Sequence, residues 1–216
     1  YPVVVARRYK SDIIQITHCC DLPCDLGCLV IDQLLFNVTQ SALAGRSDRV
    51  FKTPLDDWES PCESLRDSSS SFWKPVPQSP KMSFEGFERA IEAHIRADIK
   101  HFYCSFWSGT LPGVHEGRPI SLIQVWNPDD FDRLISNLVG HYLAQKRANI
   151  RFSVFIGTPD DDDELSVSVD NQTGEIFLER AGQGFVEPIA PSLEQFLAQF
   201  SLQAHRLDPT ELPEYG

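Results

Sequence analysis

The sequence predicts one α/β domain of the α+β kind, in which helices cover a central sheet that is mixed or mainly antiparallel. The chain has 216 residues, and 42% of them are hydrophobic, which is enough to build one core. Residues 127–147 have the pattern of a long amphipathic helix, and most of the predicted strands are joined by short turns. Parallel strands need long crossover connections, so these short turns favour antiparallel or mixed pairing over a doubly wound parallel sheet.

The first third of the chain combines one helix with a long connection. Residues 30–45 have apolar positions at helical spacing, and Gly45 marks the C-terminal end. These apolar positions are Leu34, Leu35, Val38, Ala42 and Leu43. Residues 46–80 are rich in Ser, Pro and Asp, so we expect an ordered connection with at most short strands, pinned by Trp58 and Trp73.

A second helix and two strands come next. Ser83 suits the N-cap of this helix. The apolar stripe of the helix consists of Phe84, Phe87, Ile91 and Ile95. Residues 101–107 are rich in aromatic side chains and predict a strand, and residues 109–117 predict a turn. A further strand, with an apolar run over residues 122–126, ends at Trp126.

The helix predicted over residues 127–147 has clear signals at both ends. Asn127 suits the N-cap and Pro128 suits the first helical position. Two aspartates follow in the first turn, where the helix dipole favours carboxylates. The apolar stripe consists of Phe131, Leu134, Ile135, Leu138 and Tyr142. Lys146 and Arg147 lie near the C-terminal carbonyls, where positive charge is favoured.

The last third predicts three strands and one helix. Residues 152–156 form an apolar run, and residues 165–169 alternate between apolar and serine side chains, as a half-buried strand does. The turn sequence NQTG then leads into a strand over residues 175–179, which predicts a hairpin. Ser192 and Gln195 match a capping box for the final helix. The inward-facing residues of that helix are Leu193, Phe196, Leu197 and Phe200.

The charge of the chain narrows the classes of partner. The formal net charge is -12, from 31 acidic and 19 basic residues. Such a chain does not suit a nucleic-acid backbone, which proteins bind by neutralising phosphates, and anionic lipid headgroups repel it. A basic protein surface is the natural partner, although acidity also serves solubility alone.

Motifs for catalysis and cofactor binding are missing, so we expect neither enzymatic activity nor a cofactor. The sequence has no G-x-S-x-G nucleophile motif, no phosphate-binding P-loop and no dinucleotide fingerprint. Its six cysteines include no C-x-x-C pair, and its six histidines show no local metal-ligand spacing. We therefore interpret His141 as a packed or surface residue.

Five consecutive carboxylates follow the strand predicted at residues 152–156. They are Asp160, Asp161, Asp162, Asp163 and Glu164. Calcium loops alternate their ligands and include a glycine, and this run does neither, so a solvated turn explains it, while a metal-dependent enzyme stays one hypothesis. Glu85 and Asp132 add carboxylates from two separate predicted helices. We predict that these seven residues belong to an acidic docking face.

Several short motifs occur in an order that resembles a known family. They are SPC at residues 60–62, FERAIEAHI at 87–95, HFY at 101–103, QVWNPDDF at 124–131, NLVGHYLAQKR at 137–147, FIG at 155–157 and NQTGEI at 171–176. This likeness spans roughly residues 58–202. It resembles the Syd family of SecY-interacting proteins, which is similar to the SUKH superfamily of single-domain binding proteins.

The resemblance implies a SUKH/Syd-like domain over residues 29–203 and a non-enzymatic function. It implies binding to cytosolic loops of SecY, a subunit of the SecYEG export channel, to regulate or monitor channel assembly. Such loops carry excess Lys and Arg, so an acidic face is complementary to them. We expect a monomer in the cytoplasm and on the cytoplasmic side of the cell inner membrane, held there peripherally by its protein partner. The SUKH likeness leaves an alternative, an immunity-type inhibitor of a basic toxin.

Both ends of the chain lie outside the predicted domain. Residues 1–28 contain three basic and three acidic residues and begin with Tyr1. We interpret them as a non-native or disordered extension, with the true start near Leu29 or Val30. Residues 204–216 contain two prolines and three carboxylates and are predicted to be a disordered tail.

Overall fold

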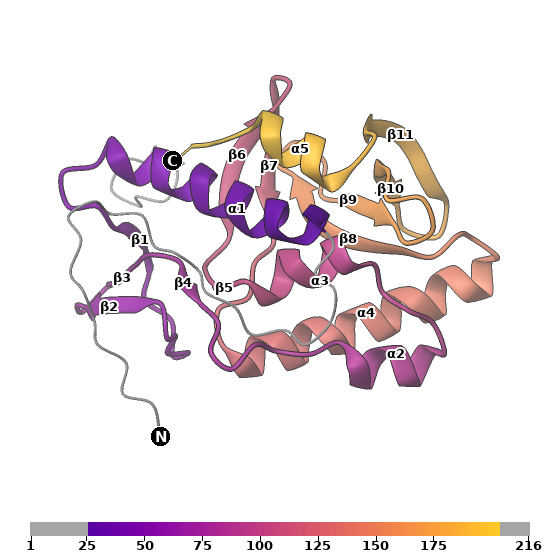
Figure 1. Ribbon diagram of the computed structural model, residues 1–216, viewed down its shortest axis with the longest axis horizontal. Helices are drawn as coiled ribbons and strands as arrows, with labels where there is room; N and C mark the ends of the chain where they lie inside the picture. The colour runs from indigo at the N-terminus through magenta and orange to yellow at the C-terminus, as the bar shows by residue number, and fades with distance from the viewer. Residues whose placement is uncertain (1–25, 204–216) are drawn as a thin grey trace, which may run out of the picture.

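Seven antiparallel strands form the central sheet of the protein, whose computed structural model describes residues 26–203 (Figure 1). In spatial order the strands are β11 (Gly184–Ala190), β10 (Ile176–Arg180), β9 (Leu165–Asp170), β8 (Ser153–Pro159), β7 (Arg118–Leu122), β6 (Leu111–His115) and β12 (Phe200–Leu202). Every neighbouring pair in this order is antiparallel. The predicted α+β domain with a mainly antiparallel sheet is therefore confirmed.

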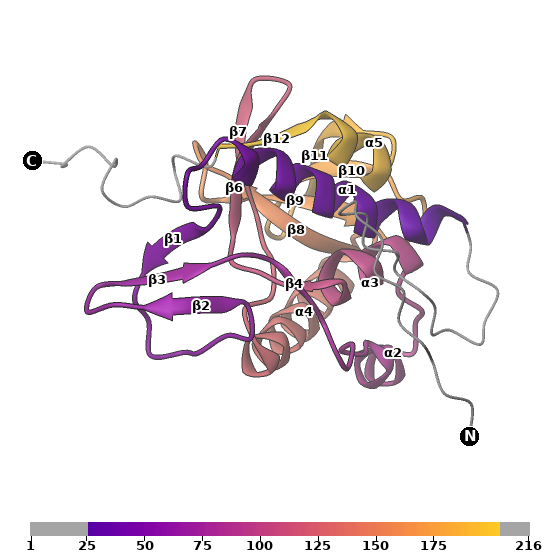
Figure 2. The ribbon, with the colours of Figure 1, turned by 60° about the vertical axis from the view of Figure 1, so that its left-hand side comes forward.

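The described chain also has two smaller sheets. The strands of one all precede the second helix in sequence, and the other pairs a strand before that helix with a strand after it. One contains β1 (Phe51–Pro54), β3 (Ser70–Trp73) and β2 (Glu63–Arg66) in that order, and the other pairs β4 (Val76–Pro77) with β5 (Phe106–Trp107). Figure 2 shows the three-stranded sheet beside the start of helix α4 (Pro128–Ala148). The predicted connection with short strands is confirmed, although Trp73 is fully buried whereas Trp58 is 38% exposed.

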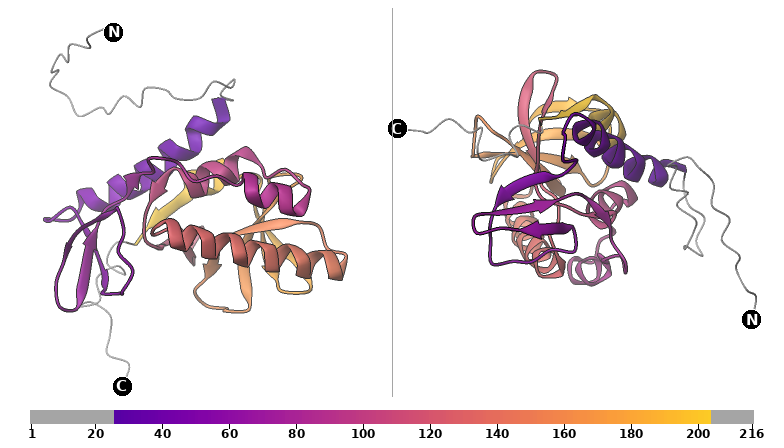
Figure 3. Two further views of the ribbon diagram at one scale, coloured as in Figure 1. Left: turned by 90° about the horizontal axis from the view of Figure 1, so that it is seen from below. Right: turned by 90° about the vertical axis from the view of Figure 1, so that its left-hand side faces the viewer.

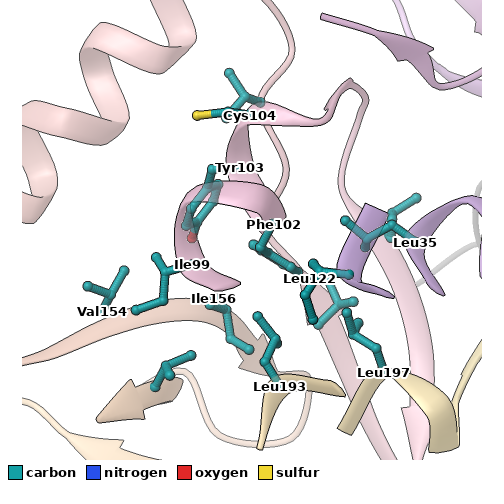
Figure 4. Packing of buried hydrophobic residues seen from close by; sticks show 14 of the residues in the cluster. Leu35, Ile99, Phe102, Tyr103, Cys104, Leu122, Val154, Ile156, Leu193 and Leu197 are labelled. Carbon is teal, nitrogen blue, oxygen red and sulfur yellow. The ribbon is translucent and has the colours of Figure 1, made fainter. Parts of the chain in front are cut away.

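Three helices cover one face of the central sheet. Helices α1 (Leu26–Ala44), α3 (Ala97–Cys104) and α5 (Leu193–Gln199) lie together there, with α1 in contact with the other two (Figures 1 and 3). Figure 4 shows the core that they form with strands β7 and β8. Its side chains include Leu35, Phe102, Leu122, Ile156 and Leu197, each at most 2% exposed.

Helix α4 lies on the opposite face of the sheet. Successive side chains of a strand point to opposite faces, and Val154 points into the core. Its neighbours Ser153 and Phe155 instead contact Gln145 and His141 of α4. The α4 helix therefore covers part of the face that α1, α3 and α5 leave open.

The ends of α4 have the predicted local structure. The side-chain oxygen of Asn127 accepts a hydrogen bond from the N–H of Asp130 at 2.8 Å, and the predicted proline follows in the first turn. Asn149 ends the helix with a left-handed φ of 54°, and its N–H bonds to carbonyls of the last turn. Phe131 and Leu138 of the predicted stripe are buried.

One predicted strand is a helix. Residues 97–104 form α3, and only Phe106–Trp107 of the strand expected over residues 101–107 is extended. Ile99, Phe102 and Tyr103 recur at spacings of three and four and are all buried. Packing of this one helical face against the core therefore overrides the strand-like aromatic content.

The predicted turn at residues 109–117 is mostly strand. Strands β6 and β7 form a hairpin whose turn consists of Glu116 and Gly117, with φ values of 49° and 83°. A two-residue turn with positive φ at both positions matches the right-handed twist of an antiparallel pair. Only the last two residues of the predicted turn are therefore a turn.

Strand β7 ends at Leu122, not at Trp126. The N–H of Ile123 still donates to the Ile156 carbonyl oxygen at 2.9 Å, but the carbonyl oxygen of Val125 accepts from Ser108 at 2.9 Å. The chain leaves the sheet here because it must reach the other face to begin α4. The apolar character of residues 123–126 reflects burial between elements, which strand periodicity does not distinguish.

Helix α2 (Glu85–Ile91) is shorter than predicted. The Ser83 hydroxyl accepts a hydrogen bond from the N–H of Glu85 at 3.2 Å, but Phe84 occupies the N-cap position. Glu92 ends the helix in the left-handed region with a φ of 54°. Ile95 is buried, yet it lies beyond the helix. The apolar spacing therefore extends beyond the end of the helix, and no glycine or proline marks that end in the sequence.

The C-terminal third follows the prediction with two additions. The NQTG turn joins β9 to β10, and the Ser192 hydroxyl caps α5 by accepting from the N–H of Gln195 at 3.2 Å. Strand β11 was not predicted. Phe200, predicted on the helix, begins β12 because it pairs with His115 of β6.

The predicted terminal segments lie mainly outside the described residues. The tail over residues 204–216 lies wholly outside, and so do residues 1–25 of the expected extension. Helix α1 begins at Leu26 and crosses the expected boundary at residue 29. Among the helices described between residues 26 and 203, none has the length and apolarity needed to span a bilayer.

Candidate partner-binding cleft

A cleft of about 740 Å³ opens between the three-stranded sheet, the first turns of α4 and the central sheet near Phe155. Carboxylates and aromatic rings meet in its lining, together with an arginine. These residues are Asp56, Glu63, Asp130, Trp58, Trp126, Phe155 and Arg133. The cleft therefore joins negative charge to ring faces, a combination that attracts cationic side chains.

Hydrogen bonds hold the loop of Trp58 against the start of α4. The indole N–H of Trp126 donates to the carbonyl oxygen of Trp58 at 3.0 Å, and the side-chain amide of Asn127 donates to the carbonyl oxygen of Glu59 at 2.8 Å. The Ser60 hydroxyl donates to the carbonyl oxygen of Trp126. These bonds between distant parts of the chain fix one wall of the cleft relative to the other.

Asp130 has two roles at the mouth of the cleft. One of its carboxylate oxygens accepts from the main-chain N–H of Trp126 at 2.9 Å, which holds the side chain in place at the first turn of α4. The other accepts from Nη2 of Arg133 at 2.6 Å. The same guanidinium lies 5.4 Å from the ring centre of Trp58. A carboxylate and an indole thus share one cation.

The other two carboxylates of the cleft differ in exposure. The Glu63 side chain is 7% exposed, accepts from the N–H of Ser60 at 2.6 Å and pairs with Arg66 at 2.9 Å. Asp56 is exposed and accepts from the N–H of Trp58 at 3.3 Å. Asp56 is therefore the more available of the two for an incoming cation.

The structure places the predicted site residues on three separate elements. Asp132 is exposed on α4 and does not line the cleft, although it lies between Asp130 and Arg133 in the sequence. Glu85 lies at the start of α2, where it pairs with Arg89 at 3.7 Å and borders a different, smaller hollow. Helices α2 and α4 contact each other. Of the seven predicted carboxylates, Asp132 is the one nearest in sequence to the cleft lining.

The acidic run forms the loop between β8 and β9, and none of its residues lines the cleft. Asp162 pairs with Arg180 at 3.1 Å, and Glu164 pairs with the same guanidinium. Asp160 accepts from the Ser121 hydroxyl at 2.8 Å. The charge of the run is thus partly compensated within the chain, and its two other aspartates are exposed.

A buried polar cluster links α4 to the sheet. The Glu179 carboxylate, 2% exposed, accepts from the Gln145 amide at 2.6 Å and lies 3.6 Å from the His141 ring nitrogen. Burial raises the pKa of Glu179, but hydrogen bonds from His141 and Ser153 and the charge of His141 outweigh it, so the pKa lies below its ordinary value. His141 is a packed residue, as interpreted from the sequence.

Within residues 26–203, the structure offers neither a reactive cysteine nor a metal-binding cluster. Burial raises the pKa of Cys62 and of Cys104 to about 12, so both remain thiols at neutral pH. Between residues 26 and 203, no group of three or more His, Cys, Asp or Glu side chains is arranged to hold a metal ion. The acidic run lies within these residues.

Sequence reasoning missed three residues of the cleft. Asp130 was explained by its place in the first helical turn, Trp58 was given a structural role, and Arg133 was not considered. A usable signal is the segment at residues 56–59, in which three carboxylates flank a tryptophan within a connection rich in Pro and Ser. Exposed acidic and aromatic residues together are typical of sites that bind cations.

Comparison with known proteins identifies the family. The model of the family described as "Syd protein (SUKH-2)" matches residues 31–201. Protein Syd of Pseudoalteromonas atlantica is 37% identical over 146 residues, which cover 66% of this chain and 78% of that protein. Protein Syd of Psychromonas ingrahamii is 37% identical over 142 residues, covering 65% and 77%, and that of Alteromonas mediterranea is 36% identical over 147 residues, covering 67% and 81%. The chain therefore belongs to the Syd family.

Proposed function

We propose that this chain is a non-enzymatic protein that binds basic cytosolic loops of SecY and thereby regulates or monitors assembly of the export channel. The observation that carries the proposal is the cleft at the start of α4, in which Asp56, Asp130 and two tryptophan rings meet. Cytoplasmic loops of membrane proteins carry excess Lys and Arg, which are the side chains that such a cleft attracts.

The wider surface supports the approach of a basic partner. The net charge of -12 produces a field that accelerates encounter with a positively charged surface. Asp132 adds exposed charge on α4, while Glu85 and residues 160–164 add charge on α2 and on the loop between β8 and β9. In this proposal the cleft holds the partner, and the outer carboxylates increase the association rate.

The proposal includes where the protein acts. The chain is a monomer that stays in the cytoplasm and reaches the cytoplasmic side of the inner membrane only through SecY. Repulsion between an acidic protein and anionic headgroups supports a peripheral contact mediated by protein, and the same repulsion speaks against nucleic acid.

Binding to vesicles tests this proposal. Flotation compares SecYEG-containing vesicles with protein-free vesicles of the same anionic lipids, and we expect association with the first alone. The double substitution Asp56→Asn with Asp132→Asn should weaken binding by up to about thirtyfold, since each exposed pair contributes up to about 1 kcal/mol. The matched control is Glu175→Gln with Glu194→Gln, two exposed carboxylates on other elements. Equal binding to both kinds of vesicle, or equal loss in both variants, contradicts the proposal.

The SUKH-2 part of the family description favours one alternative. An immunity-type inhibitor of a basic toxin would use the same acidic cleft. Pull-down from detergent extracts of membranes separates the two functions, because the proposed function requires capture of SecY that weakens as salt rises. Failure to capture SecY, combined with tight binding of a basic nuclease, would establish the alternative.

A further inference from the structure

The guanidinium of Arg133 occupies a position that a partner's side chain would also suit. Its Nη2 and Nε atoms lie 2.6 and 3.0 Å from one oxygen of Asp130, and its carbon lies 5.4 Å from the Trp58 ring centre. We propose that this ring and carboxylate form an arginine subsite of the cleft, which the chain's own Arg133 fills until an arginine of a basic partner segment displaces it. The inference rests on the proposed function for the basic nature of the partner.

The receptor side of this subsite is anchored through the Asp130 carboxylate and the main chain at Trp58. Asp130 is 13% exposed and is held by the N–H of Trp126, and the main chain at Trp58 is held by the indole of Trp126. The carboxylate cannot move without breaking its bond at the start of α4, and the main chain that carries the Trp58 ring is anchored there as well. The site is therefore organised before a partner arrives, which lowers the cost of binding.

The occupant is by contrast a surface side chain. The Arg133 side chain is 67% exposed, and its ion pair is of the i,i+3 type on a helix surface. Because the guanidinium end of this pair is exposed to solvent, holding it there contributes little, and an incoming cation can compete for the carboxylate. A guanidinium from a partner can therefore replace it without unfolding any element.

The geometry favours arginine over lysine. A planar guanidinium stacks on an indole and donates more than one hydrogen bond to a carboxylate, whereas an ammonium is a compact and strongly hydrated charge. Beyond the subsite, Asp56 and Phe155 line the rest of a cleft of about 740 Å³, which lies within the usual volume range of ligand sites. The occupant is thus an extended basic segment, with one arginine in the subsite.

A peptide assay without SecY tests the inference. The probes are the peptide acetyl-GSRGRSG-amide and its counterpart with both arginines replaced by lysine, and calorimetry measures their affinities for the full chain. If Arg133 fills the subsite about four-fifths of the time, Arg133→Ala should raise the affinity for the arginine peptide about fivefold. The lysine peptide should gain less, and Trp58→Ala should weaken the arginine peptide in either background.

The matched control is Arg89→Ala. Arg89 is 75% exposed and also forms an exposed ion pair within one helix, but on α2 and not in the cleft. It corrects for the general effect of removing one positive charge. Thermal melting of each variant checks that the fold is intact, and Arg133→Lys provides a second variant that should release the subsite only in part.

Three results of these experiments would contradict the arginine subsite. A gain for Arg133→Ala that is no larger than that for Arg89→Ala, or equal gains for both peptides, overturns the inference. Dimerisation of Arg133→Ala in sedimentation without peptide also overturns it, because a second copy would then be the occupant. If the peptide results are as expected but SecY vesicles do not bind, the proposed function fails and the subsite stands.

Discussion

The indole nitrogen of Trp126 lies 3.0 Å from the carbonyl oxygen of Trp58, so the residue before the N-cap of α4 holds the loop that forms one wall of the cleft. Asn127 adds a second bond from the same turn, to the carbonyl oxygen of Glu59 at 2.8 Å. The start of the helix is thus also the attachment point of the cleft. Substitutions at the start of α4 should therefore change two quantities that can be measured separately, the stability of the helix and the geometry of the cleft.

Asn127→Ala should lower the free energy of unfolding by roughly 0.5–2 kcal/mol, because it removes the oxygen that caps α4. It also removes the amide that donates to Glu59. Asn127→Ser keeps a capping oxygen but loses this donor, so it should retain most of the stability while the amides of residues 58–60 exchange faster. Urea titration and hydrogen exchange measure the two effects.

The two variants check each other. If the Ser and Ala variants lose the same stability, the cap contributes little and the bond to the loop carries the effect. If exchange in residues 58–60 is unchanged in both, the bond from Asn127 does not hold the wall of the cleft.

Leu138→Ala should destabilise the fold by roughly 2–5 kcal/mol, because the truncation leaves a cavity at a fully buried position on α4. Leu143→Ala is the control on the same helix, since Leu143 is 42% exposed. Surface substitutions of this kind stay within about 0.5 kcal/mol. Equal changes in the urea midpoint for the two variants would contradict the burial of Leu138 in the core.

The elements that the sequence predicted correctly are those with local signals. The cap of α4 lies within four residues, Asn127 to Asp130, and the turn of the β9–β10 hairpin lies in NQTG. Part of helix α3 was predicted as a strand because Phe102 and Tyr103 favour strands locally. Their burial against the core stabilises the helix instead. That packing is a property of the whole fold.

The cleft could not be predicted from local pattern. Asp130 and Arg133 are neighbours on a helix, and sequence reasoning can pair them. Trp58 joins them only because main-chain carbonyls of its loop accept hydrogen bonds from the turn before α4. Main-chain acceptors have no residue-specific signal, so the side chains did not reveal which loop would dock there.

We expect the free energy of unfolding to decrease at acidic pH because the Glu179 carboxylate becomes protonated. The folded-state pKa of this carboxyl lies below its ordinary value of 4.5, so the native state binds fewer protons than the unfolded chain near that pH. Its contribution is therefore present above about pH 4.5 and is lost as pH falls through the folded value. Glu179→Gln should lack this contribution, and the stability difference from the parent should shrink below about pH 4.5.

Urea unfolding at pH values from about 7 to about 3 measures this difference. Glu194→Gln, at an exposed position on α5, is the control for the loss of one carboxylate outside the buried cluster. A difference for Glu179→Gln that stays constant down to pH 3 would show that its carboxyl titrates alike in both states.

The last prediction concerns the loop between β8 and β9. Within it, Asp161 and Asp163 are exposed, whereas Asp162 and Glu164 share the Arg180 guanidinium. Asp161→Asn with Asp163→Asn removes uncompensated charge, and should slow association with SecY vesicles while leaving the melting temperature unchanged. Neutralising the other pair frees the positive charge of Arg180, so we expect it to slow association further.

Salt provides an independent check on the same loop. Raising the ionic strength from about 0.05 M to about 0.5 M shortens the screening length to a few ångströms, so it should slow association of the parent and mimic the double substitution. The association rate is therefore measured against salt for the parent and both variants. Because steering acts on encounter, dissociation rates should stay equal, and a change confined to dissociation would mean that the run contacts SecY directly. Equal association rates and equal salt slopes in all three proteins would exclude the run from the approach surface and leave the cleft at the start of α4 as the acidic element that acts.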